Sequence, residues 1–144
     1  MKSSITVLAA ASVLGLMLSV GEVAAANNSI VGTWHSEFAA NGMACSMQSI
    51  YESDHTYSEL LHCGNLMTHQ SGTYVMSGGL LVRTVEDWDP KQQWVVGSCV
   101  GCGYWQTMAK PPGGTYRVTF ASAAKATLHD VNLGGTLTIY RSSP

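Results

Sequence analysis

Two stretches of sequence decide the fold of this chain: Ile30-Val31-Gly32-Thr33-Trp34 near the start of its β-rich region and Leu137-Thr138-Ile139-Tyr140-Arg141 at the end. In the second stretch apolar side chains alternate with threonine and tyrosine, which is the period-two pattern of a half-buried β-strand. The same alternation places Arg141 on the apolar face. A basic side chain therefore belongs to the inner side of the last strand.

The sequence between these two stretches is β-like throughout. Compact turn signals such as Ser77-Gly78-Gly79 and Asp89-Pro90-Lys91 separate short runs of alternating residues. No segment after residue 26 has a helical apolar period. Short turns favour sequential antiparallel pairing, so the sequence predicts an all-β fold, either an up-and-down barrel of about eight strands or a β-sandwich. The expected strands cover residues 31–38, 44–51, 56–62, 72–77, 80–87, 93–98, 104–108, 115–120, 125–129 and 135–141.

Composition excludes some classes of protein. The chain has 144 residues, of which 46% are hydrophobic, with 7 Lys and Arg against 9 Asp and Glu. This length predicts one domain. A net charge of −2 gives no basic surface for nucleic acid, and the ordinary hydrophobic fraction excludes a disordered chain.

The first 26 residues are typical of a secretory signal peptide. Lys2 precedes a 16-residue uncharged run, Ile5 to Val20, and Ala24-Ala25-Ala26 supplies small residues for cleavage after Ala26. The alternative is a membrane anchor, but the run is short for a span and ends in Gly21-Glu22. We expect residues 27–144 to form one exported domain, periplasmic or secreted, with no membrane span after signal removal.

Four cysteines in an exported chain indicate disulfides. Two β-like runs, Ser46 to Tyr51 and Thr56 to Leu61, flank a turn. If Glu52 pairs with Thr56 across that turn, the numbers of opposed residues sum to 108, and Cys45 faces Cys63. The register predicts a bond between them.

Cys99 and Cys102 form a C-x-x-C pattern, which also occurs in redox and metal sites. Glycines surround the pair and no helix-forming segment follows, while Gly103 stands where haem attachment needs histidine. The pattern favours a structural disulfide that closes a tight turn, with Gly101 supplying a positive φ.

The two stretches quoted first resemble the calycin superfamily of lipocalin-like barrels, in which G-x-W on the first strand meets a basic residue near the end of the last strand. Gly32 and Trp34 match the first element, and Arg141 matches the second. The resemblance implies a lipocalin-like barrel closed by the guanidinium lying over the indole, a cation–π contact. Gly-Thr-Tyr at 72–74 and Gly-Gly-Thr at 113–115 and 134–136 are also similar to small bacterial lipocalin-like domains.

One face of the 45–63 hairpin is expected to line the barrel. It is the more apolar face, and it places Ser49 opposite Glu59. A buried carboxylate needs a polar or charged partner. Glu59 is therefore paired inside the barrel, lies near the hydrated rim of the barrel or contacts a ligand. The candidate ligand contacts on this face are Met47, Tyr51, Tyr57, Glu59 and Leu61.

Aromatic residues also gather around two turns between residues 88 and 105. They predict either core packing and closure of the barrel rim or an aromatic lip for a ligand or protein partner. We include Trp88, Trp94 and Trp105 among the candidate binding residues.

The sequence contains no recognisable catalytic or metal-binding motif. The five histidines show no H-x-H or H-E-x-x-H spacing, and the chain has no G-x-S-x-G or phosphate-binding loop. We expect no metal, no cofactor and no enzymatic activity.

Two hypotheses about function follow. The resemblance implies an exported carrier of a small, mainly apolar molecule, whereas a filled barrel would act through its rim as a protein-binding or inhibitor module. A cavity of about 300 Å³ or more lined by Met47, Tyr51 and Tyr57 would favour the carrier.

Overall fold

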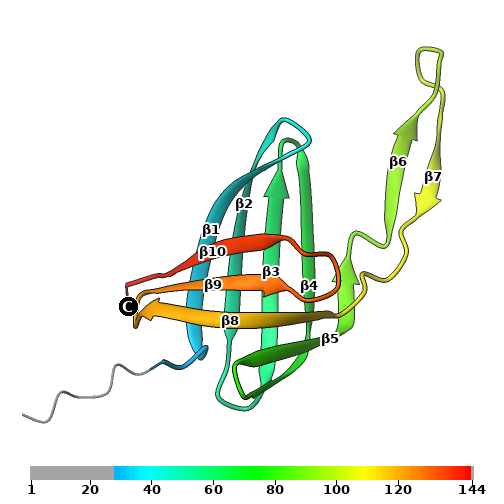
Figure 1. Cartoon of the computed structure of the whole chain (residues 1–144). Helices are drawn as coiled ribbons and strands as arrows, with labels where there is room; N and C mark the ends of the chain where they lie inside the picture. The colour runs from blue at the N-terminus through cyan, green and yellow to red at the C-terminus, as the bar shows by residue number, and fades with distance from the viewer. Residues whose placement is uncertain (1–27, 144) are drawn as a thin grey trace, which may run out of the picture.

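The computed structural model describes residues 28–143, in which every regular element is a β-strand (Figure 1). The predicted signal peptide, residues 1–26, lies outside the described residues. The strands are β1 (Gly32–Ala40), β2 (Met43–Tyr51), β3 (Thr56–Cys63), β4 (Leu66–Ser77), β5 (Leu80–Asp89), β6 (Gln92–Val96), β7 (Gly103–Thr107), β8 (Gly114–Ser122), β9 (Lys125–Asp130) and β10 (Thr136–Arg141).

Eight of these strands form a closed antiparallel barrel in the order β1-β10-β9-β8-β5-β4-β3-β2. Each strand pairs with its neighbour in sequence except where β5 passes to β8, and β10 returns to pair with β1. The predicted all-β up-and-down barrel is therefore confirmed. The sandwich alternative is wrong, because β1 pairs on both of its edges.

Strands β6 and β7 leave the barrel as a separate two-stranded ribbon, which we call the β6–β7 arm (residues 92–107). Figure 1 shows this arm projecting beyond the end of β5. The sequence predicted sequential pairing across Asp89-Pro90-Lys91, and this was wrong: β6 pairs only with β7, while β5 pairs with β8. Proline has no N–H to continue the ladder of β5, and the glycine-rich turn at 97–103 folds β6 onto β7 instead.

Strand β4 is longer than predicted, since it begins at Leu66 rather than at residue 72. Its first half pairs with β3 from Cys63↔Leu66 to Glu59↔Gln70. The turn between the strands is only two residues long, and Gly64 in it takes a φ of 58°. Residues 68–71 are polar and lack a clear strand pattern, so pairing with β3 determines their conformation.

The core lies inside the barrel and follows strict alternation along the strands. In β5, Leu81, Arg83 and Val85 are buried while the residues between them are exposed. A β-bulge at Ser71/Gly72 shifts the register of β4 on β5. Gly72 is required there, because a Cβ would collide with the carbonyl oxygen of Thr84.

Candidate functional site

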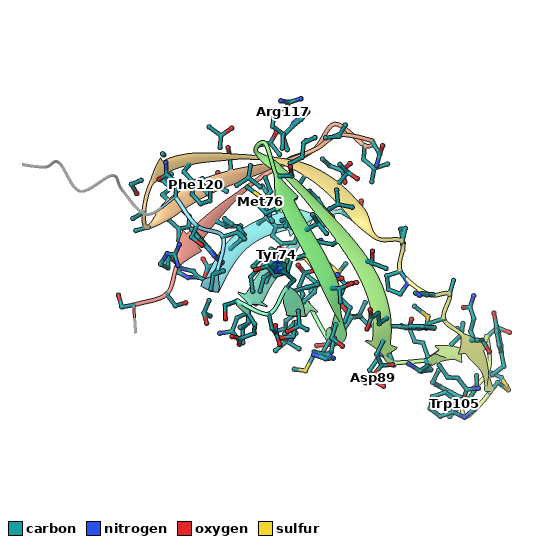
Figure 2. All side chains as sticks on the ribbon, turned by 90° about the horizontal axis from the view of Figure 1, so that it is seen from below. Tyr74, Met76, Asp89, Trp105, Arg117 and Phe120 are labelled. Carbon is teal, nitrogen blue, oxygen red and sulfur yellow. A yellow bond between two sulfur atoms is a disulfide. The ribbon has the colours of Figure 1, made fainter. Side chains whose placement is uncertain are left out.

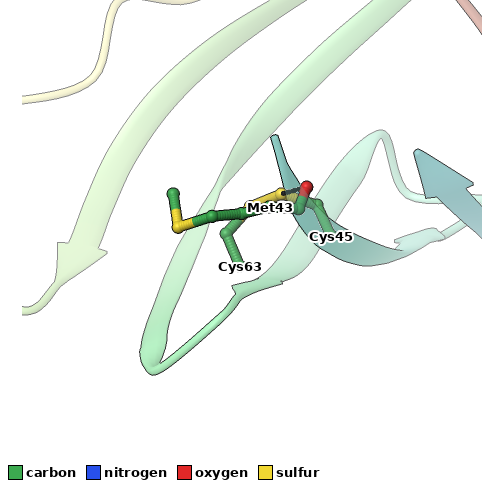
Figure 3. Close-up of a disulfide and its surroundings, with 3 residues drawn as sticks. All are labelled: Met43, Cys45 and Cys63. Atoms are coloured by element: carbon green, nitrogen blue, oxygen red, sulfur yellow. Dashed lines mark hydrogen bonds between the residues drawn. A yellow bond between two sulfur atoms is a disulfide. The ribbon is translucent and has the colours of Figure 1, made fainter. Parts of the chain in front are cut away.

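The β2–β3 hairpin has the predicted register. Cys45 faces Cys63, Ser49 faces Glu59 and Tyr51 faces Tyr57, so each opposed pair sums to 108. The predicted disulfide between Cys45 and Cys63 is confirmed, with Cα atoms 4.2 Å apart (Figure 3). The predicted face of the hairpin points inward, with both tyrosines at most 3% exposed.

Glu59 lies at the centre of a buried polar network. Its carboxylate is ion-paired with the guanidinium of Arg83, and both side chains are about 8% exposed. Ser49 Oγ donates to Glu59 Oε2 at 2.9 Å, and Gln70 Nε2 donates to Oε1 at 2.7 Å. Both carboxylate oxygens therefore have partners inside the barrel, as a buried charge requires.

Arg83 connects this carboxylate to three tyrosines. Its Nη2 donates to Tyr116 Oη at 2.8 Å, and its Nη1 lies 3.4 Å from Tyr51 Oη. The guanidinium also lies over the rings of Tyr116 and Tyr57, 4.6 and 5.3 Å from their centroids. These contacts hold the cation among aromatic faces, where cation–π attraction supplements the ion pair.

Burial sets the electrostatics of this network. Burial alone would lower the pKa of Arg83. The electrostatic effect of the neighbouring Tyr51 and Glu59 is larger, however, and raises the pKa of Arg83 above its ordinary value. Burial also raises the pKa of Tyr51 to about 12. At neutral pH the site therefore contains a charged guanidinium and a protonated Tyr51 hydroxyl.

The tyrosines occupy the barrel beside this network. Tyr51 stacks on Tyr57 with ring centroids 6.0 Å apart and meets Tyr74 edge-on at 5.2 Å. Figure 2 shows Tyr74 and Met76 on the inner side of the barrel wall. This part of the interior is filled with protein side chains.

Two hollows reach this network or its edge: one of about 400 Å³ is lined by Arg83, and one of about 70 Å³ is lined by Gln70 and Trp88. Two others are lined by none of the network residues. One of about 720 Å³ opens at the rim between the β1–β2 and β3–β4 turns, beside Phe38, Cys45 and Gly64. Another, of about 230 Å³, lies against the outer faces of β1 to β3 and reaches Met47. Neither of these two is lined by Tyr51, Tyr57, Glu59 or Leu61, so Met47 is the one ligand contact expected on the β2–β3 hairpin that lines either of them.

Arg83 was missed by the sequence analysis, although a signal was present. It lies two residues from Leu81 and two from Val85, so alternation alone places it on the buried face of β5. Its pairing with Glu59 could not be predicted in the same way, because β4 lies between β3 and β5.

The candidate aromatic residues do not form one lip. Trp88 is half-buried on β5 at the barrel rim, where the Lys91 ammonium lies 4.1 Å from its ring centroid. Trp94 and Trp105 lie on the β6–β7 arm, and Figure 2 shows Trp105 far from the barrel interior. The structure thus separates one rim residue from two arm residues.

The three expected closure residues lie together at the seam between β1 and β10. The Arg141 guanidinium carbon is 4.4 Å from the Trp34 ring centroid, and its two terminal nitrogens donate to the carbonyls of Val31 and Ser29 at 2.6 Å. Gly32 has a φ of 128°, and a Cβ there would collide with Arg141 Nη1. This arrangement closes the barrel at the end opposite the arm.

A second disulfide joins Cys99 and Cys102 at the tip of the arm. The Cys102 amide donates to the Cys99 carbonyl at 3.0 Å, and the Gly97 amide donates to the Cys102 carbonyl at 2.8 Å. Gly101 has a φ of 77°, as the predicted tight turn requires. The tip is therefore a cross-linked turn.

The fold and site define a class: a closed eight-stranded antiparallel barrel with an ion-paired interior and a disulfide-tipped arm. No family model and no curated protein matches the sequence. In the described part of the chain no helix is long and apolar enough to cross a membrane.

Proposed function

We propose that this protein is an exported, lipocalin-like binding module that is not an enzyme and that acts through its exterior. The observation that carries the proposal is the engagement of Glu59 with Arg83, Ser49 and Gln70 inside the barrel. A carrier would need these groups to be free for a ligand. Here they bind each other, so the barrel serves as a scaffold.

The β6–β7 arm is the binding element in this proposal. Trp94 and Trp105 are 44% and 63% exposed, and Tyr104 is 59% exposed. Exposed aromatic side chains on a cross-linked ribbon provide contact area at low entropic cost, because the disulfide and the turn fix them before binding.

Two further features support the lipocalin-like and exported parts of the proposal. Gly32, Trp34 and Arg141 have the closure geometry that the resemblance implies. Disulfides such as Cys45–Cys63 form in oxidising compartments, which agrees with a periplasmic or secreted location.

Native mass spectrometry of the protein purified from its source tests the filled barrel. We expect the mass of the processed polypeptide with two disulfides and nothing more. A retained small molecule that is lost in a Glu59→Gln variant would refute the proposal in favour of a carrier.

Site-specific photocrosslinking tests the arm. A photoreactive amino acid replaces Trp105 in one variant and Val75, a 61% exposed residue on the barrel wall, in a matched control. In the producing cell we expect adducts from position 105 and none from position 75. Equal labelling at both positions, or none at position 105, would contradict the role of the arm.

A further inference from the structure

The β6–β7 arm lacks charge. No Asp, Glu, Lys, Arg or His occurs from Gln92 to Ala109, although Lys91 and Lys110 bracket this segment. Exposed strand edges in proteins usually carry charges that prevent unwanted contacts. The arm has no charged side chain, and the outer edges of its two strands are unpaired. It is therefore suited to a partner that binds without opposite charges.

Apolar and aromatic side chains lie on both faces of the half of the arm nearer its tip, beyond the polar pairs Gln92↔Thr107 and Gln93↔Gln106 at its base. Trp94 lies opposite Trp105 on one face, with ring centroids 5.4 Å apart in an edge-on arrangement, and Val96 continues that face. On the other face Val95 lies opposite the exposed Tyr104. A flat protein surface would cover only one of these faces, whereas a lipid environment surrounds both.

Turns at the same end of the barrel also expose apolar residues. Met43 and Met67, next to the β1–β2 and β3–β4 turns, are 48% and 58% exposed, and Leu133 in the β9–β10 turn is 86% exposed. Figure 1 shows the β1–β2 turn, the β3–β4 turn and the tip of the arm on the same side of the molecule. The arm is thus accompanied by exposed apolar side chains in three turns at this end of the barrel.

We propose that this end rests on a lipid bilayer, with the tip of the β6–β7 arm inserted into the interfacial layer of a zwitterionic membrane. Trp94, Trp105 and Tyr104 would lie at the level of the headgroups, where tryptophan and tyrosine are enriched. Val100 at the tip, fully exposed in the free protein, would lie deepest. The inference rests on the proposed function, because it names what the arm contacts.

The geometry limits how far the arm can insert. Five-residue strands span about 17 Å, and interfacial elements bury their apolar side chains about 5–10 Å deep. The outer edges of β6 and β7 carry N–H and C=O groups without partners in the barrel or the arm. Such groups are not tolerated in the hydrocarbon core but find water and headgroup acceptors at the interface. Insertion therefore stops in the headgroup region.

Charge predicts how binding responds to salt. The Lys91 ammonium is already paired with Asp87, and the whole chain has a net charge of −2. Neither feature attracts anionic lipid. Binding should therefore depend on aromatic and apolar contact and be nearly independent of ionic strength.

Vesicle flotation of the processed, disulfide-bonded protein tests the proposal. The probes are vesicles of phosphatidylcholine alone and vesicles that also contain phosphatidylglycerol. We expect similar binding to both, unchanged by high salt, together with a blue shift of tryptophan fluorescence from the exposed Trp94 and Trp105. Binding only to the anionic vesicles, abolished by salt, would overturn the inference, as would no binding to either.

Matched variants locate the contact. Trp94→Ser with Trp105→Ser should reduce vesicle binding about tenfold or more, with a thermal melt that matches the wild type, because the arm lies outside the barrel. Val75→Ser, on the barrel wall, should leave binding unchanged. If the double tryptophan variant binds vesicles as well as the wild type, the inference is wrong.

The two proposals fail in different ways. If the protein does not bind vesicles and a specific protein adduct forms at position 105, the lipid contact is refuted and the filled-barrel module stands. A small molecule retained in the barrel would refute the proposed function whatever the vesicles show.

Discussion

Replacing Arg83 with methionine should destabilise the barrel strongly. Methionine fills much of the same space but removes the cation beside Glu59 and the donor to Tyr116. The Glu59 carboxylate would keep only its hydrogen bonds from Ser49 and Gln70. Glu59 is only 7% exposed to solvent. It would become a buried charge without a counter-ion.

The expected cost follows from that burial. Removing one partner of a buried ion pair costs about 3–5 kcal/mol, because the remaining charge is desolvated without compensation. For a domain of this size each 1 kcal/mol lowers the Tm by about 4 °C, so the Tm should fall by about 12–20 °C. Thermal unfolding followed by circular dichroism, with urea titration at neutral pH, measures both quantities.

Two control variants make the prediction specific. Arg117→Met removes an exposed arginine that points away from the barrel in Figure 2, and should change stability by less than about 0.5 kcal/mol. Glu59→Gln combined with Arg83→Met removes both charges and should recover most of the loss. If Arg83→Met costs no more than Arg117→Met, the ion pair does not contribute as argued. If the double variant is as unstable as Arg83→Met, lost packing rather than an unpaired charge is the cause.

Other predictions concern closure, cross-links and pH. Arg141→Ala should lower the free energy of unfolding by about 1–3 kcal/mol, because it removes the hydrogen bonds from Arg141 to two backbone carbonyls. Thermal unfolding measures this loss, and vesicle binding should stay the same. An unchanged melting curve would show that the seam does not depend on this side chain. Replacing Cys45 and Cys63 with alanine should cost about 2–4 kcal/mol in urea unfolding, because their bond closes a loop with a sequence separation of 18; no change in the midpoint would contradict this. Burial raises the pKa of Tyr51 from 10.0 to about 12, so its contribution to stability is fully present below pH 10 and is lost as the pH rises through about 12. Burial also raises the pKa of Tyr57 and Tyr74, so near-ultraviolet absorbance titration should show several late-ionising tyrosines. The component that ionises near pH 12 should disappear in Tyr51→Phe, and an identical titration of that variant would refute the assignment.

Local patterns in the sequence predicted local structure well. The β2–β3 hairpin could be derived to the residue, because one short turn and strict alternation leave a single register that satisfies the cysteines. Alternation could equally have placed Arg83 on the inner face of β5. Its partner depends on which strands lie side by side around the barrel, and nothing in the residues near position 83 carries that information.

The arm shows the other limit of prediction. Alternation and turn signals correctly indicated strands near Trp94 and Trp105, but strand patterns do not state whether a hairpin joins the main sheet. The proline after β5 was the local sign that the ladder stops there. Whether Trp94 and Trp88 meet at one rim therefore had to come from the structure.

The seam between β1 and β10 has a consequence for how the protein folds. Its clamp joins Arg141 to the carbonyl of Val31, 110 positions earlier in the chain. Contacts between residues so far apart in the sequence form late in folding. They make folding slow, because the long loop between them must lose conformational entropy before the contacts stabilise the chain. Until β10 arrives, β1 presents an unpaired edge that can pair with other chains. Variants that weaken the seam should therefore aggregate during refolding at protein concentrations where the wild type recovers fully, even when their native state is only modestly destabilised.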